Sequence, residues 1–127
     1  AWSLSSDPLQ SLLVFIGLYQ EMVDGLTDEN PGCLFASFCY ESGQFDAEVL
    51  QVLDDVILAW RERIADWLRE AAAAHPPVRP IDVDTLADLL TVVFEGAFVV
   101  ARSTRQPRVF AEQLQHYRTY LELLFAA

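Results

Sequence analysis

The sequence lacks lysine altogether, and its eight basic residues, all arginines, stand against 19 acidic residues. The formal net charge is therefore −11 at pH 7. Proteins that hold nucleic acid do so with clustered Lys and Arg side chains against the phosphates. The arginines here are scattered or fall in short runs, such as Arg61 with Arg63. We therefore expect nucleic acid to repel this domain, so the domain does not itself bind DNA.

Cysteine and histidine are scarce, with two of each. Cys33 and Cys39 fall six residues apart in one predicted helix, which separates their Cα atoms by roughly 9 Å, too far for a disulfide. We expect free thiols in a reducing cytosol, and hence a cytoplasmic protein. His75 and His116 are far apart and belong to no metal-binding pattern such as HxxxH. The sequence predicts no metal site and no cofactor.

Long hydrophobic runs and targeting signals are also absent. The most apolar stretch, residues 91–101, contains Glu95 and is shorter than the ~20 residues that a bilayer crossing requires. The first ten residues include neither a basic segment nor a cleavage pattern for a signal peptide. We expect no contact with a membrane. Because the first residue is Ala rather than Met, we also expect a fragment of a longer protein.

No pattern of catalytic residues is present. Ser37 and Ser42 lack the context of an activated nucleophile, and the acidic pair Asp54–Asp55 suits a solvated helix face better than acid–base chemistry. We predict no catalytic residues and no enzymatic activity.

Hydrophobic residues, in contrast, are abundant, at 53% of the chain with a mean hydropathy of +0.22. Their 3.6-residue spacing, punctuated by Pro and Gly, predicts one all-α domain of five helices with no strands. Caps at Asp7, Asp46 and Asp82 begin the first, third and fourth helices. The predicted helices run from Pro8 to near Gly25, from Gly32 to about Ser42, from Asp46 to about Ala74, from Asp82 to about Ser103, and from Gln106-Pro107 to near Phe125.

The last two predicted helices are apolar on more than one side, which favours a role beyond a simple core. Gly96 costs helix stability, and close approach of another backbone would explain its presence. We expect the two helices to pack against the equivalent helices of a second subunit in a C2 homodimer, as a four-helix bundle. The alternative is that both are central helices of a monomer. The predicted interface residues are Leu90, Ala97, Ala101, Phe110, Leu114, Tyr117, Leu121 and Leu124.

The order of these segments resembles a known family. A capped helix is followed by Pro31-Gly32-Cys33-Leu34-Phe35, a long Trp-containing helix, Asp84 to Leu90, Phe94-Glu95-Gly96-Ala97-Phe98, and Gln113-Leu114 with Tyr117 to Leu121. Over residues 1–127 the chain resembles the C-terminal ligand-binding and dimerisation domain of TetR/AcrR-family transcriptional regulators. The resemblance implies a repressor from which a small molecule releases operator DNA. An N-terminal helix-turn-helix domain, which we do not find in this sequence, would bind that DNA.

The resemblance also implies a ligand pocket among the first four helices. By position, its candidate lining is Phe15, Tyr19, Phe35, Phe38, Cys39, Ile57, Trp60, Phe94 and Phe98. Taken singly, each of these residues suits plain core better than ligand contact. Aromatic walls suit an apolar or aromatic effector. Because the protein is acidic, it penalises a neutral or cationic ligand less than an anionic one. Glu95 is an acid in an apolar helix: it could bind a ligand amine, pair with an arginine such as Arg102, or lie at a solvated edge.

Two functional interpretations follow. In the first, ligand filling the cavity between the first and fourth helices shifts the population of the dimer between two settings of its DNA-binding heads. In the second, the chain is a helical protein–protein adaptor that has no small-molecule ligand and uses its apolar faces for a different chain.

Overall fold

The computed structural model describes residues 7–24 and 42–125 of the chain. These residues form α1 (Pro8–Asp24), a short 3₁₀ turn (Ser42–Gln44), α3 (Ala47–Ala74), α4 (Val83–Thr104) and α5 (Arg108–Leu124). No strand occurs within the described ranges, so the all-α prediction is confirmed. The predicted helix over residues 32–42 lies almost entirely outside the described residues, and the count of five helices stays a prediction.

Aspartate caps begin three of the helices, as the sequence predicts. The Asp7 carboxylate accepts a hydrogen bond from the Leu9 amide at 3.0 Å, and the Asp46 carboxylate accepts one from the Val49 amide at 3.0 Å. The Asp82 carboxylate accepts from the amides of residues 84 and 85. Each cap satisfies amide groups that have no partner within the helix itself. Local sequence therefore determines where these helices start.

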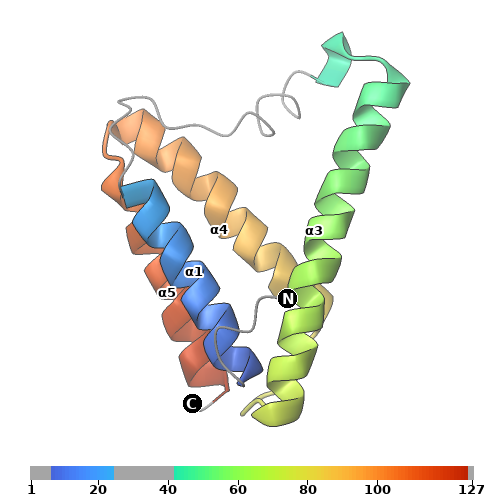
Figure 1. Cartoon of the computed structure of the whole chain (residues 1–127). Helices are drawn as coiled ribbons and strands as arrows, with labels where there is room; N and C mark the ends of the chain where they lie inside the picture. The colour runs from blue at the N-terminus through green and yellow to red at the C-terminus, as the bar shows by residue number, and fades with distance from the viewer. Residues whose placement is uncertain (1–6, 25–41, 126–127) are drawn as a thin grey trace.

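The four α-helices form a bundle that is closed at one end (Figure 1). Helix α5 packs against α1 and α4, and α3 packs against α1 and α4. The N-terminal half of α3 diverges from α4, while its C-terminal half lies close to the start of α4 (Figure 1). Accordingly, the buried residues of α3, from Ile64 to Ala71, all lie in its second half.

The core lies between α1, α4 and α5 and the C-terminal half of α3. Its largest fully buried side chains include Leu9, Leu12, Ile16, Ile64, Leu68, Leu90, Phe110, Leu114, Leu121 and Phe125. Full burial of such a side chain is worth about 1.5–3 kcal/mol relative to exposure. The Tyr117 hydroxyl, buried in the same core, donates a hydrogen bond to the Leu86 carbonyl oxygen at 3.0 Å and so links α5 to α4.

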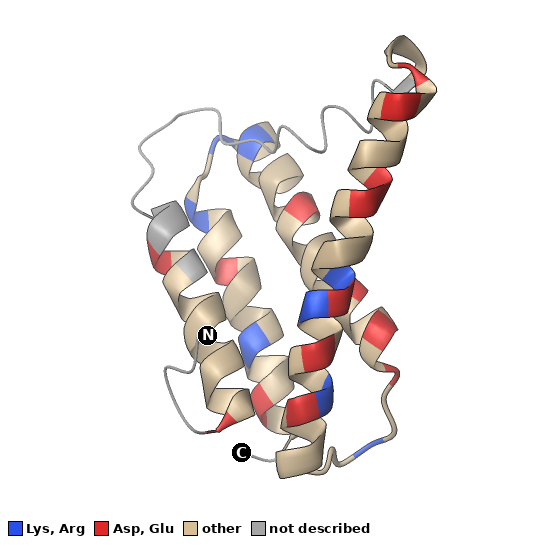
Figure 2. Cartoon of the chain, turned by 45° about the vertical axis from the view of Figure 1, so that its right-hand side comes forward, with Lys and Arg blue, Asp and Glu red and all other residues tan. Residues whose placement is uncertain are grey.

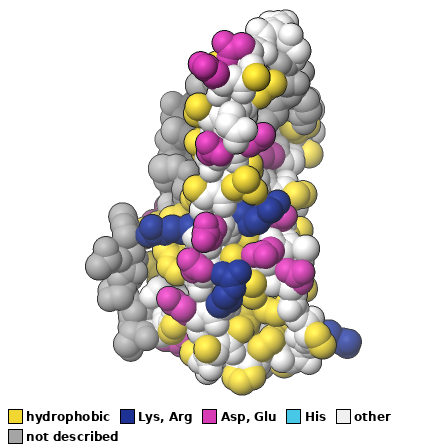
Figure 3. Space-filling view, turned by 90° about the vertical axis from the view of Figure 1, so that its right-hand side faces the viewer, with side chains coloured by type: hydrophobic (Ala, Val, Ile, Leu, Met, Phe, Trp, Pro, Cys, Tyr) yellow, Lys and Arg dark blue, Asp and Glu magenta, His cyan; other side chains and the backbone are white. Residues whose placement is uncertain are grey.

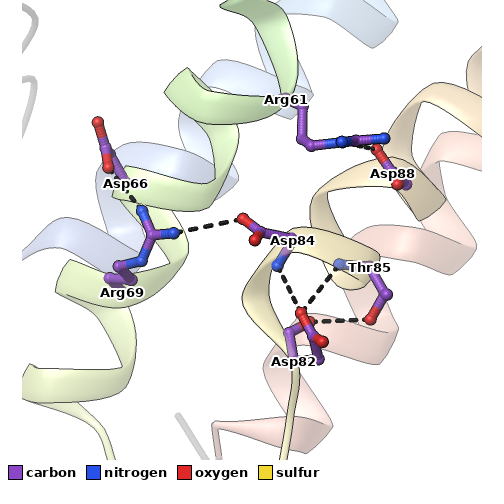
Figure 4. A network of polar contacts seen from close by, with 7 residues as sticks. All are labelled: Arg61, Asp66, Arg69, Asp82, Asp84, Thr85 and Asp88. Atoms are coloured by element: carbon purple, nitrogen blue, oxygen red, sulfur yellow. Dashed lines mark hydrogen bonds and ion pairs between the residues drawn. The ribbon is translucent and has the colours of Figure 1, made fainter. Parts of the chain in front are cut away.

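Ion pairs hold α3 against the beginning of α4. The Arg61 guanidinium lies 2.7 Å from the Asp88 carboxylate, and Arg69 contacts both Asp66, at 2.7 Å, and Asp84, at 3.3 Å (Figure 4). Acidic residues also mark the N-terminal part of α3, where it leaves the bundle (Figure 2). The paired side chains are 43–62% exposed, so solvent screens each pair and its contribution to stability is small.

None of the described helices combines the length with the apolar character that a membrane span requires.

Candidate functional site

A pocket of about 430 Å³ lies between α1 and α3. It is lined by Phe15, Val56, Ala59, Trp60, Arg63 and Trp67, and we call it the aromatic pocket. The ring centroids of Phe15 and Trp67 are 5.0 Å apart in an edge-to-face arrangement, and those of Phe15 and Trp60 are 6.2 Å apart. The volume falls in the range of small-molecule sites in proteins. The pocket is open to solvent, since Val56, Ala59 and Arg63 are exposed. Its lining therefore suits a small, mainly apolar ligand that stays partly exposed.

The residues that α3 contributes to the aromatic pocket follow helical spacing. Val56, Trp60, Arg63 and Trp67 are separated by four, three and four residues, which places them on one face of the helix. The Arg63 guanidinium lies 5.4 Å from the centre of the Trp67 ring, within the range of a cation–π interaction. A cation is thus held at the aromatic wall of the pocket.

The predicted ligand residues are distributed over several places. Phe15 and Trp60 lie in the aromatic pocket, and Ile57 is half-buried on α3. Tyr19 lies on α1, but its side chain is not among those described, and Phe35, Phe38 and Cys39 fall outside the described residues. Sequence reasoning missed Arg63 and Trp67 as pocket residues. Their spacing of three and seven residues from Trp60 could have identified them, since those positions share its helix face.

Phe94 and Phe98 pack towards α5 rather than into the aromatic pocket. Their ring centroids lie 4.7 Å and 4.6 Å from that of Phe110, and 6.2 Å from each other. Phe110 is fully buried. The three rings form one aromatic cluster at the α4–α5 contact, so the structure joins two predicted ligand residues with one predicted interface residue.

Glu95 lies two helical turns beyond Asp88, on the side of α4 that faces α3. The residue is half-buried, and its Oε2 atom is buried without a hydrogen-bond partner among the described residues. Within that part of the chain no ion pair joins Glu95 to Arg102. A buried carboxylate oxygen without a hydrogen-bond partner is costly in free energy. This position therefore suits a hydrogen-bond donor from outside the described residues.

A second surface feature lies on the outside of α4 and α5. A groove of about 340 Å³ runs between the two helices, lined by Val92, Val93, Gly96, Ala97, Val100, Val109 and Gln113. Large apolar side chains of the two helices are exposed: Val92, which lines the groove, is 64% exposed, and Leu123, farther along α5, is 70% exposed. We define the outer α4–α5 face by its exposed residues: Leu89, Val92, Gly96, Val99, Val100, Gln113, His116, Tyr120 and Leu123.

Apart from the adjacent Val99 and Val100, these residues recur every three or four positions along each helix, so they form one continuous stripe on α4 and another on α5. None of them is an Asp, Glu, Lys or Arg. The exposed side of α3, in contrast, mixes hydrophobic with acidic and basic side chains (Figure 3). An uncharged, largely apolar face in a chain of net charge −11 indicates a surface made for contact.

The residues predicted for the dimer interface lie in the core of the single chain. Leu90, Ala97, Ala101, Phe110, Leu114, Tyr117, Leu121 and Leu124 are each at most 5% exposed. The wider apolar stripe of α5 is used by α1 and α4, which leaves these side chains almost no surface for a second subunit. Any pairing of subunits through these helices has to use their exposed neighbours on the outer α4–α5 face.

Comparison with known proteins adds one finding. A family model described as the tetracyclin repressor-like C-terminal domain matches residues 8–117. The matched range includes α1, α3, α4 and more than half of α5, and with them the aromatic pocket and most of the outer α4–α5 face. Searches of curated proteins and of solved structures found no match.

Proposed function

This chain belongs to the tetracyclin repressor-like C-terminal domain family, and we propose from that membership that it is the ligand-sensing and dimerisation domain of a transcriptional repressor. The family is regulatory rather than enzymatic, in agreement with the prediction of no enzymatic activity. In this proposal the aromatic pocket holds the effector and the outer α4–α5 face holds a second copy of the chain.

The main support for the dimerisation proposal comes from Gly96. It is exposed on the outer α4–α5 face, and a Cβ atom added there meets nothing within 4 Å. Glycine in a helix interior costs about 1 kcal/mol relative to alanine. No close contact between the described parts of the chain compensates for that cost. A second helix packed against Gly96 would occupy the space that the absent side chain leaves, because two backbones can approach most closely at glycine.

The chemistry of the outer α4–α5 face supports the same conclusion. Interface cores are depleted of charged residues, and this face has none. In a C2 dimer each copy presents the same patch to the other, and two helices from each copy would form a four-helix bundle. Burial of Val92 and Leu123, the most exposed large apolar residues of this face, would be the main gain.

The effector would act by shifting the population between two arrangements of the bundle. The aromatic pocket spans α1 and α3, whereas the sequence predicted a cavity between the first and fourth helices. A ligand in this pocket would therefore fix α1 relative to α3. In a full-length repressor the DNA-binding heads precede α1, so such a shift would change their spacing and release operator DNA.

The oligomeric state tests the proposal. We expect the wild-type chain to be a dimer at micromolar concentration by size-exclusion chromatography with light scattering. Val92→Glu combined with Leu123→Glu should give a folded monomer, because it places charges in the apolar contact. Val78→Glu is the matched control, since Val78 is 61% exposed but lies in the α3–α4 loop, and this variant should remain a dimer.

Glycine variants sharpen the test. Gly96→Leu should weaken the dimer, while a monomer would accommodate the new side chain in open space. A wild-type chain that is monomeric at tens of micromolar would contradict the dimer. It would instead favour the helical adaptor, in which a different chain covers the same face.

A further inference from the structure

The aromatic pocket has one charged lining residue, Arg63, and its surroundings define the chemistry of the ligand. We propose that the pocket binds a flat aromatic carboxylate, with the ring packed against the aromatic walls and the carboxylate on the Arg63 guanidinium. This inference rests on the proposed sensor function and specifies the class of its effector.

The walls of the pocket favour an aromatic body. Phe15, Trp60 and Trp67 supply three rings, with Val56 and Ala59 between them on α3. Aromatic rings pair with one another in offset or edge-to-face geometry at centroid separations of about 4.5–7 Å. The Phe15–Trp60 and Phe15–Trp67 pairs already have this spacing. A planar ring can therefore extend the cluster.

The polar side-chain groups of the pocket favour an acceptor on the ligand. Among the described residues, the only such groups in its lining are the Arg63 guanidinium and the indole N–H groups of Trp60 and Trp67. All of these groups donate hydrogen bonds and none of them accepts one. A ligand amine would find no acceptor side chain in the lining, whereas a carboxylate offers only acceptors. This local chemistry argues against the cationic ligand that the net charge of the chain suggested.

Arg63 also differs from neighbouring arginines in its contacts. Arg61 is paired with Asp88, and Arg69 is paired with Asp66 and Asp84 (Figure 4). Arg63 contacts the Trp67 ring, and no carboxylate of the described residues lies within ion-pair distance of it. A guanidinium can stack on an indole with its face and bind a carboxylate through its edge. Arg63 is thus arranged to receive an anion.

The negative charge of the whole chain does not prevent this binding. Charges farther away than the Debye length, about 8 Å at physiological ionic strength, are largely screened. The acidic residue one turn away on α3, Asp66, is already paired with Arg69. The charge nearest the bound carboxylate would therefore be the Arg63 guanidinium.

Three probes of the same shape test the inference by calorimetric titration of the 127-residue chain: 2-naphthoate, 2-naphthamide and 2-naphthylmethylammonium. We expect naphthoate to bind about three- to fivefold more tightly than the amide, as a partly exposed ion pair provides, and the ammonium probe to bind most weakly. Arg63→Gln should reduce naphthoate to the affinity of the amide and leave the amide unchanged. Arg63→Lys, which keeps the charge, should restore part of the preference.

Two further variants locate the site. Arg79→Gln, at an exposed arginine of the α3–α4 loop, should leave all three affinities unchanged. Trp67→Leu should weaken naphthoate and naphthamide alike, because it removes a ring that both probes use. Trp67→Leu should lower the melting temperature, because it removes the ring contact with Phe15. Circular dichroism should show that every variant is still folded at the temperature of the titration, so that loss of binding is not loss of folding.

Equal binding of naphthoate and naphthamide, or an Arg63→Gln variant that weakens both equally, would overturn the anion inference. Tighter binding of the amide or the ammonium probe than of naphthoate would also overturn it, yet would leave the proposed sensor function in place. Failure of all three probes to bind would overturn it too. The dimer of the proposed function is tested separately, by the oligomeric state of the wild-type chain.

Discussion

The Nε2 atom of His75 lies 2.7 Å from the Oδ2 atom of Asp7. The contact joins the residue that caps α1 to the residue at which α3 ends. The other carboxylate oxygen of Asp7 accepts from the Leu9 amide. The hydrogen bond from His75 lowers the pKa of Asp7 below its ordinary value, and so, to a lesser extent, does the bond from Leu9. The start of α1 is therefore tied to the far end of α3 by a charge-dependent contact.

This contact predicts a pH-dependent effect of Asp7→Asn. A carboxyl group with a lowered pKa in the folded state stabilises the fold above its unfolded pKa of about 3.9, and that contribution is lost as the pH falls through the folded pKa. Asparagine keeps the helix cap but has no charge. We expect the variant to be less stable than the wild type in urea at pH 7 and pH 5, and the difference to shrink as the pH falls below about 3.9. A difference that stays constant over this range would contradict the role of the charge.

The buried hydroxyl of Tyr117 provides a second prediction. Its hydrogen bond to the Leu86 carbonyl joins α5 to α4, and burial raises the pKa of Tyr117 well above its usual range. Tyr117→Phe should lower the free energy of unfolding by about 0.5–1.5 kcal/mol, the usual worth of one hydrogen bond. Tyr120→Phe on the same helix is the control in protein dilute enough to be monomeric, because Tyr120 is 47% exposed in the single chain. Urea unfolding should separate the two variants, and equal losses would show that the hydrogen bond contributes nothing.

The turn between α4 and α5 provides a third prediction. Arg105 ends α4 in the left-handed region, at φ 57° and ψ 38°, and is the only non-glycine residue with positive φ among those described. That conformation costs a residue with a Cβ atom about 1 kcal/mol or more. Arg105→Gly should therefore raise the melting temperature. Arg102→Gly, within the last turn of α4, should lower it by removing helix propensity. A destabilised Arg105→Gly variant would contradict this account of the turn.

The helix boundaries were largely predictable from the sequence because caps and breakers are local signals. Asp46 begins α3 and His75 ends it, where the sequence predicted a helix to about Ala74. Asp82 begins α4 as predicted, and α4 continues one residue beyond the predicted Ser103. Such signals depend on hydrogen bonds within a few residues, and the tertiary fold does not change them.

The choice of helix faces was not predictable in the same way. Helix α5 has two apolar stripes, one with Leu114 and Leu121 and one with Tyr120 and Leu123. Both satisfy the 3.6-residue period, and only the positions of α1 and α4 decide which one becomes core. The sequence therefore predicted the buried stripe as the interface. For the same reason Phe94, which faces α5, was assigned to the ligand pocket.

The two stripes of α5 provide the last prediction. Leu114 is fully buried and Leu123 is 70% exposed, so the same substitution to alanine should act on different processes. Leu114→Ala should cost about 2–5 kcal/mol of folding stability, because it leaves a cavity in the core.

Leu123→Ala removes little from the single chain but reduces the apolar surface that a second copy would bury. Dimerisation stabilises a fold by mass action, so its contribution grows with protein concentration. The effect of Leu123→Ala should accordingly be small in dilute protein and increase as the concentration rises, whereas the loss in Leu114→Ala should persist in dilute protein. Urea unfolding over a hundredfold range of protein concentration measures both. A Leu123→Ala effect that is absent at every concentration would mean that this stripe of α5 meets no second copy, and the outer α4–α5 face would then have to serve another partner.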